Sequence, residues 1–376
     1  MTLKSLLPII MDNLPPELLD AAAKKQLGTL AEALHIASGG IIELPISQNT
    51  GPVGVGICLT EKEDGFSLLE KPDASFGALS KPKVWAALKQ FAQTRSKTAN
   101  PLRTAVKQSW LEFDIDSKTT RLPAPGFFFK LEEPYNRPLV SVAAKGGLEL
   151  IQKGLESLGV SVSPLSLDTL ARCIEVASAS TSVGYIGVML GRETPGFRMV
   201  LAGMPFYNIM GYLKKIDYAP RKGMLPLVDF LIERVGLERL SLHLDIHEGI
   251  QPRLGLEVKM DPQLNQPTAW QAFLEQLIHT GMCTPARAGA LPAWIRQFQH
   301  AEISEKWPEA LERKYASLHR SISHVKFSYQ PGYFSKDIPP GEFGATLASQ
   351  AHAGEISTKA YLAYQAVRAL PSDLWA

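Results

Sequence analysis

The chain is poor in the features that mark metal-binding, secreted and membrane proteins. Its 376 residues include three cysteines, Cys58, Cys173 and Cys283, which lie far apart and form no Cys-x-x-Cys pair. That spacing predicts neither a zinc knuckle nor a disulfide framework, and it fits a reducing cytoplasm. No apolar run is long enough to cross a bilayer, and the N-terminal segment lacks the cleavage site of a signal peptide.

An excess of charge of one sign is also missing. The 39 Lys and Arg residues against 37 Asp and Glu give a net charge of +2, and the basic residues do not run together. We therefore expect no nucleic-acid partner. The Gly-rich segment PVGVG, residues 52–56, lacks the Gly-Lys-Ser/Thr ending and the helix start of a phosphate loop.

The chain does contain repeated strand pairs. Several segments alternate apolar and polar residues with period two, which is the signature of half-buried strands. Turn residues join them in pairs, so they are predicted to form hairpins. The five pairs are GIIELPIS with GPVGVGICLT, SWLEFDID with PGFFFKLE, VGYIGVML with GFRMVLAG, LSLHLDIHE with PRLGLEVKM, and SHVKFSYQ with STKAYLAY.

A segment with helical periodicity precedes each hairpin, and it is usually long enough for two helices. Ser166 and Thr284, the latter followed by Pro285, are predicted N-caps. This order excludes a Rossmann fold and a TIM barrel, in which single strands alternate with single helices. We expect one α+β domain over residues 1–376, built from about five αββα units. The long Pro- and Gly-rich connection 331–356 in the last hairpin has two interpretations, a lid that closes one barrel mouth and a disordered segment.

Each predicted strand has one apolar and one polar face. An open antiparallel sheet with one wet face and a closed barrel with a polar lumen both satisfy this pattern. A sheet of about ten strands is near the size at which open sheets curl or close, and closure removes the edge strands. The large, mixed side chains of the polar faces favour a lumen. In SWLEFDID the apolar face carries Leu111, Phe113 and Ile115, and the polar face carries Trp110, Glu112, Asp114 and Asp116.

The strand LSLHLDIHE places a histidine and a carboxylate together. His243 and Asp245 share one face, where an aspartate-oriented histidine is suited to act as a general base. With His247, and with His324 from the last hairpin, the donors would also suit zinc or iron. A buried structural hydrogen-bond network is the third interpretation.

The order of elements resembles the ABBA prenyltransferase fold, in which a ten-stranded antiparallel barrel lies inside a ring of helices. The fragments KAYL, residues 359–362, and HVKFSY, residues 324–329, look like the Lys-x-Tyr and Lys-bearing strands of its aromatic prenyltransferases. The resemblance implies a diphosphate held by cations and tyrosine, aromatic side chains that shield an allylic cation, and a carboxylate that orients the acceptor. The matching positions are Glu112 for the acceptor and, for diphosphate, Arg198, Arg253, Lys259, Lys326, Lys359 and Tyr361.

Departures from that fold's enzymes leave alternatives open. The Asp-Asp-x-x-Asp signature of other prenyl-transfer enzymes is absent, and many carboxylates share the predicted lumen. Either these carboxylates pair with the cations across strands, or Mg²⁺ bridges them, or the ligand is not a diphosphate. The predicted catalytic residues are Glu112, His243 and Asp245. The other predicted substrate-binding residues are Trp110, Asp114, Phe128, Lys130, Tyr185, Glu257 and His324.

The leading interpretation is thus an enzyme of the prenyl-transfer type that acts on an aromatic or peptide acceptor. A non-catalytic protein that binds a peptide or small molecule for partner enzymes is the alternative. An acid–base isomerase or cyclase centred on His243 and Asp245 is the third hypothesis.

Overall fold

The structure is a computed structural model that describes most of the chain. The described ranges are 3–34, 37–49, 51–70, 82–115, 124–137, 142–191, 196–219, 224–235, 239–260, 266–312, 314–331 and 355–368. Asp116 and residues 332–354, nearly all of the long connection in the last hairpin, lie outside them.

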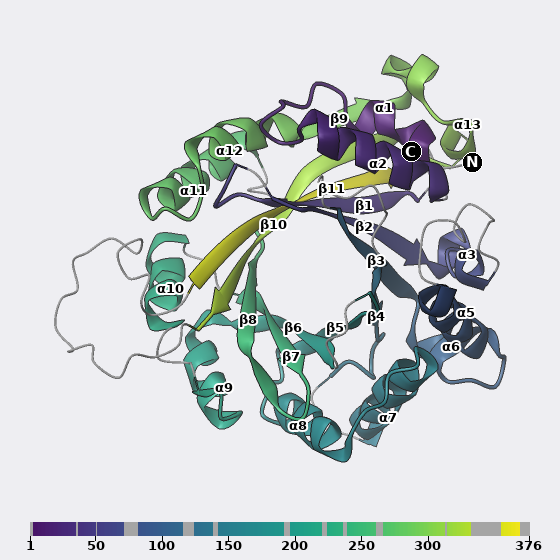
Figure 1. The fold of residues 1–376 in the computed structure, drawn as a ribbon, viewed down its shortest axis with the longest axis vertical. Helices are drawn as coiled ribbons and strands as arrows, with labels where there is room; N and C mark the ends of the chain where they lie inside the picture. The colour runs from purple at the N-terminus through teal and green to yellow at the C-terminus, as the bar shows by residue number, and fades with distance from the viewer. Residues whose placement is uncertain are drawn as a thin grey trace, which may run out of the picture.

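Ten strands close into an antiparallel barrel (Figure 1). Each strand from β1 to β7 pairs with the one that follows it, β8 pairs with β10, and β10 pairs with β11, which pairs back onto β1. The predicted hairpins and the closed barrel are confirmed. Their bounds are β1 Gly39–Pro45, β2 Val53–Thr60, β3 Gln108–Ile115, β4 Gly126–Lys130, β5 Ser182–Met189, β6 Phe197–Pro205, β7 Arg239–Ile246, β8 Ile250–Val258, β10 Ser317–Gln330 and β11 Glu355–Val367.

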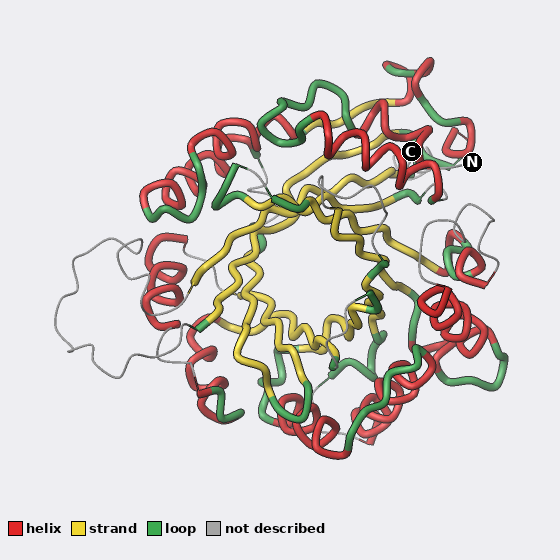
Figure 2. Tube along the Cα trace, viewed as in Figure 1, coloured by secondary structure: helices red, strands yellow, loops and turns green. Residues whose placement is uncertain are grey.

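The helices surround the barrel, as Figure 2 shows by the red ring outside the yellow one. Among the described helices, none combines the length and apolarity that a membrane crossing needs. Their bounds are η1 Leu3–Leu6, α1 Leu7–Ile10, α2 Ala21–Ala33, η2 Glu61–Glu63, α3 Ser67–Glu70, α5 Pro82–Ser96, α6 Leu102–Ala105, α7 Val142–Ser157, α8 Pro164–Glu175, η3 Phe206–Asn208, α9 Ile209–Lys215, α10 Leu225–Phe230, η5 Leu231–Val235, α11 Pro267–His279, α12 Pro285–Ala290, η7 Leu291–Trp294, η8 His300–Glu302, η9 Ser304–Lys306 and α13 Glu309–Glu312.

The core lies between the barrel and these helices. The outward residues of β4, Phe127 and Phe129, are fully buried. Their rings lie 4.8 and 5.5 Å from that of Phe91 in α5. Each such side chain stabilises the fold by about 1.5–3 kcal/mol through burial of apolar surface. The apolar face of this strand therefore packs against a helix, and its other face is left to the lumen.

One of the two predicted helix caps is confirmed. Thr284 Oγ1 accepts a hydrogen bond from the Arg287 amide at the start of α12. The cap at Ser166 is wrong: α8 begins at Pro164, and Ser163 is its N-cap. Proline fits the first helical position because its missing N–H would lack a partner there in any case.

Strand β10 contains a bulge at Ser323, which the sequence pattern did not predict. The register of β10 with β11 shifts between Ile322 and His324. Arg320 and Ile322 are buried outside the lumen, whereas His324 and Lys326, of the same parity, line it. A short strand, β9 Arg296–Gln299, also escaped prediction and pairs with the first part of β10.

The close approach of Phe128 to Gly187, its partner on β5, generates a first prediction. A methyl group at Gly187 would lie 2.0 Å from the Phe128 ring. Gly187→Ala should therefore lower the free energy of unfolding by about 1–3 kcal/mol, measured by urea denaturation. The matched control is Gly211→Ala in α9, where nothing lies within 4 Å. It should be neutral or stabilise by up to about 1 kcal/mol, and equal midpoints for the two variants would contradict this account.

Candidate functional site

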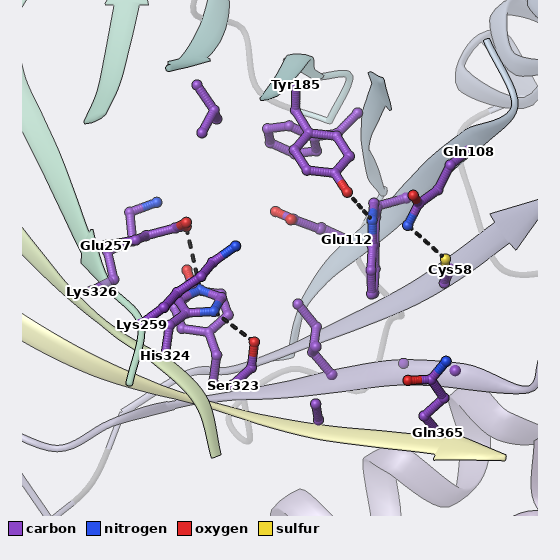
Figure 3. Close-up of a pocket in the computed structure, with 18 of the residues that line it drawn as sticks. Cys58, Gln108, Glu112, Tyr185, Glu257, Lys259, Ser323, His324, Lys326 and Gln365 are labelled. Carbon is purple, nitrogen blue, oxygen red and sulfur yellow. Dashed lines mark hydrogen bonds and ion pairs between the residues drawn. The ribbon is translucent and has the colours of Figure 1, made fainter. Parts of the chain in front are cut away.

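The barrel encloses a chamber of about 510 Å³, a size that suits a small organic ligand (Figure 3). Figure 3 shows Glu112 and Glu257 pointing into it from opposite sides. The polar and aromatic side chains of its lining are Ser38, Cys58, Thr60, Gln108, Trp110, Glu112, Phe128, Tyr185, Arg198, His243, Glu257, Lys259, Ser323, His324, Lys326, Tyr361, Tyr364 and Gln365.

A second cavity of about 50 Å³ adjoins the chamber. It is lined at the opposite strand ends, for example by Asp114 at the end of β3, whereas Gln108 at the start of β3 lines the chamber. Five side chains line both cavities and thus form a polar partition between them: Glu112, Arg198, His243, Lys326 and Tyr361.

Aromatic rings form much of the chamber wall. Trp110 Nε1 donates a hydrogen bond of 3.2 Å to the Tyr185 hydroxyl, which fixes both rings. Phe128 is only 5% exposed, and its ring lies against the Gly187 backbone. The chamber therefore offers rigid π surfaces beside its charged groups.

Two of the interior cations have a partner of opposite charge. Arg198 donates to both oxygens of Asp245, at 2.6 and 2.9 Å, and Lys359 donates to Glu43. The expected pairing of carboxylates with cations across strands is present in these two pairs. Glu43 was not predicted, although it alternates with Ile42 and Leu44 in β1 and so lies on the lumen face. The charges of Lys359 and Lys326 overcome the effect of burial and lower the pKa of Glu43 to about 2.

His243 is held on both ring nitrogens. Lys326 Nζ lies 2.9 Å from Nδ1, and because an ammonium group can only donate, Nδ1 is the acceptor. Nε2 then carries the proton and lies 2.6 Å from Glu257 Oε1. Gly255 makes room for this contact, since a Cβ there would lie 2.9 Å from Lys326. Burial lowers the pKa of His243 to about 4, so the ring is neutral at pH 7.

Glu257 is the carboxylate between two histidines. His324 Nε2 lies 3.3 Å from the same Oε1 atom that His243 approaches. Burial alone would raise the pKa of Glu257, but the two histidines hold it well below its ordinary value. The predicted partnership of His243 with Asp245 is therefore wrong, because Asp245 pairs with Arg198 and Glu257 takes its place.

Glu112 is the interior carboxylate that stands without a partner. Within the ranges that the structure describes, it forms no hydrogen bond or ion pair. Burial, followed by the charge of Glu43, raises its pKa to about 7, against the opposing charges of Lys326 and Arg198. Near neutral pH this group is thus able to exchange a proton or accept a hydrogen bond from a ligand.

The remaining residues that were predicted to bind a ligand lie at the edges of the two cavities or outside them. Lys259 lines the chamber and Arg253 the small cavity, both with exposed side chains. Lys130, at the end of β4, and His247, in the β7–β8 turn, line neither cavity. No three His, Cys, Asp or Glu side chains in the described ranges are arranged to hold a metal ion.

The raised pKa of Glu112 predicts a pH-dependent stability. Its pKa is about 7 in the folded chain and near 4.5 when unfolded, so the folded state binds more protons between these values. Stability contributed by this group is then lost as the pH rises from about 4.5 to 7. Glu112→Gln should be more stable than the wild type at pH 8 by about 1–3 kcal/mol and show little gain at pH 4.5. Chemical denaturation at both pH values measures this, with Glu149→Gln on the exposed face of α7 as control. A gain that does not depend on pH would refute the assignment.

The Glu43–Lys359 pair supports a double-mutant cycle. Lys359→Met leaves Glu43 unpaired and should destabilise the protein by about 2–3 kcal/mol, less than for a fully buried pair because the lysine side chain keeps 25% exposure. Adding Glu43→Gln should restore most of that loss. Additive losses in thermal unfolding would show that the two side chains do not interact.

Comparison with known proteins supports the fold. No family model matches the chain, and no curated protein matches its sequence. A solved 6-dimethylallyl tryptophan synthase is 11% identical, with 98% of this chain and 96% of that chain covered at a TM-score of 0.50. AnaPT from Neosartorya fischeri is 10% identical, with coverages of 97% and 91% and the same TM-score of 0.50. At these identities the likeness concerns the fold alone, and the architecture is that of the ABBA prenyltransferase barrel.

Proposed function

We propose that this chain transfers a prenyl group from an allylic diphosphate to an aromatic ring, either of a small molecule or of a peptide side chain. The observation that carries the proposal is the combination of aromatic walls, cations and one unpaired carboxyl group inside a closed barrel. A protein with the same fold is named for dimethylallyl transfer to tryptophan, which supports the proposal.

The aromatic walls suit an allylic cation. Loss of diphosphate leaves a carbocation that water would quench, and rings such as those of Trp110 and Tyr185 stabilise positive charge through their π faces. The barrel wall also limits the access of water to the reacting carbon. Both effects act on the charge that develops in the transition state.

The charges of the chamber suit an anionic donor. Arg198, Lys259 and Lys326 line it, against the carboxylates Glu112 and Glu257. Protonation of Glu112 would remove one negative charge, and a bound diphosphate would favour that protonation. The cations would then stabilise the leaving diphosphate by charge-assisted hydrogen bonds. When Glu112 is instead ionised, its free oxygens can accept a hydrogen bond from an N–H or O–H of the acceptor and so orient the ring.

The engaged cations favour a second candidate function. Arg198 and Lys359 are held by Asp245 and Glu43, and a ligand without phosphate would leave both pairs intact. In that case the chamber binds an aromatic molecule or peptide side chain without reaction. Glu112 would then serve as the hydrogen-bond acceptor of the bound ligand.

A donor-consumption assay tests the proposal. The protein is incubated with dimethylallyl or geranyl diphosphate, alone and with L-tryptophan, L-tyrosine and short peptides that contain them. We expect acceptor-dependent release of diphosphate and a prenylated product detected by mass spectrometry. Lys326→Met should weaken binding of dimethylallyl diphosphate by about 10- to 100-fold, the value of one charge-assisted hydrogen bond. Lys89→Met, on the exposed face of α5, is the matched control.

One result would reject prenyl transfer, and a second would reject the assignment of the donor site. Prenyl transfer is rejected if neither diphosphate binds in calorimetry or is consumed, and binding of an acceptor alone would then favour the second candidate. The donor-site assignment of Lys326 is rejected if Lys326→Met and the wild type bind diphosphate equally well.

A further inference from the structure

Prenyl transfer to an aromatic ring must dispose of a proton. The donor C–O bond breaks, diphosphate leaves with the electron pair, and a new bond forms between the allylic carbon and a ring carbon. That ring carbon then loses its hydrogen as a proton, and the electrons of the C–H bond restore aromaticity. The proton needs a nearby base that has a free lone pair and a stabilised conjugate acid.

We propose that Ser323, His324 and Glu257 form the relay that accepts this proton, an assignment that rests on the proposed function. The Ser323 hydroxyl oxygen takes the proton from the ring while its own proton passes to His324 Nδ1. The imidazolium ion that results faces the Glu257 carboxylate. Charge is conserved, because one proton enters the relay and one positive charge appears on His324.

The contacts give each group its place in the sequence of transfers. Ser323 Oγ lies 3.0 Å from His324 Nδ1, and His324 Nε2 lies 3.3 Å from Glu257 Oε1 (Figure 3). An ionised carboxylate beside Nε2 favours the tautomer with its proton there. Nδ1 then keeps its lone pair and accepts from the serine hydroxyl. Ser323 and His324 both line the chamber, so the hydroxyl is within reach of a bound ligand.

The local fold prepares this arrangement before any ligand binds. The β10 bulge brings two consecutive residues, Ser323 and His324, to the lumen, where a regular strand would present only one of them. The His324 ring stacks on Tyr361, with centroids 4.0 Å apart and an interplanar angle of 21°. The ring is thus held by a stacking partner, a hydroxyl and a carboxylate, and it is only 8% exposed.

Two other titratable groups of the chamber, His243 and Glu112, are placed differently. Both nitrogens of His243 are engaged, Nδ1 by Lys326 and Nε2 by Glu257, so this ring has no free lone pair. Glu112 points into the chamber from the side opposite Glu257, as Figure 3 shows. A ring bound between the two walls would be oriented by Glu112 on one side and deprotonated through Ser323 on the other.

An isotope experiment separates this role from a structural one. The acceptor is whichever of L-tryptophan and L-tyrosine the wild type prenylates from dimethylallyl diphosphate, in protonated and ring-deuterated forms. In Ser323→Ala we expect a transfer rate about 10²- to 10³-fold lower and a primary deuterium isotope effect that the wild type lacks. The dissociation constant of dimethylallyl diphosphate should not change. Ser323→Thr keeps the hydroxyl and should restore the rate. Ser321→Ala, on the same strand but outside the chamber lining, is the matched control.

Two results would overturn the relay. One is a normal rate without an isotope effect in Ser323→Ala, and an isotope effect in Glu112→Gln instead would transfer the role to Glu112. The other comes from ¹⁵N spectra of the histidines, with the His324 signal assigned by His324→Gln. We expect His324 to carry its proton on Nε2 and its Nδ1 signal to shift in Ser323→Ala. A proton on Nδ1 would exclude the relay, whatever the transfer assay shows. If the wild type transfers no prenyl group although His324 has the Nε2 tautomer, the proposed function is rejected, and with it the role of the relay.

Discussion

Closure of the barrel is the constraint on which the site depends. Pairing of β11 with β1 over seven residue pairs completes the ring, from Gly39 with Gln365 to Pro45 with Lys359. Once the ring is closed, every strand must direct alternate side chains inward, because the pleat has period two. The helices bury the outer half, and whatever the inner half carries is brought together from strands that are far apart in sequence. The charged and aromatic walls of the chamber therefore follow directly from the alternation of apolar and polar residues along each strand.

The interior then has to satisfy its own charges. Lys359 with Glu43 and Arg198 with Asp245 form direct pairs, and Lys326, His243 and Glu257 form a continuous chain. These contacts leave Glu112 as the interior carboxylate whose protonation state responds most readily to a ligand. The partition between the two cavities therefore separates them and also contains Glu112, the carboxyl group whose protonation can change when a ligand binds.

The sequence was sufficient to predict the architecture, because period-two alternation interrupted by helical segments is a local signal. It also indicated the inward direction of Trp110, Glu112 and Tyr185, which follows from parity along one strand. Charge partners were harder to predict, since they depend on which strands become neighbours and on the length of each side chain. Asp245 thus meets Arg198 on β6 rather than His243 on its own strand. The bulge at Ser323 left no compositional trace, and β9 is only four residues long, too short for a periodic pattern.

The bulge in β10 reverses which residues of the strand point into the barrel. Before Ser323, even-numbered residues such as Arg320 are buried outside the barrel, and Arg320 donates to the Ile10 and Asp12 carbonyls of the N-terminal segment. After it, even-numbered residues such as Lys326 enter the lumen. Deleting Ser323 would remove the bulge and leave regular alternation, so that Ile322 would still point outward and His324 and Lys326 would still enter the lumen. The extra residue thus adds one inward side chain, that of Ser323, without displacing the side chains that follow it, and its loss from β10 would change the contents of the lumen at this one position.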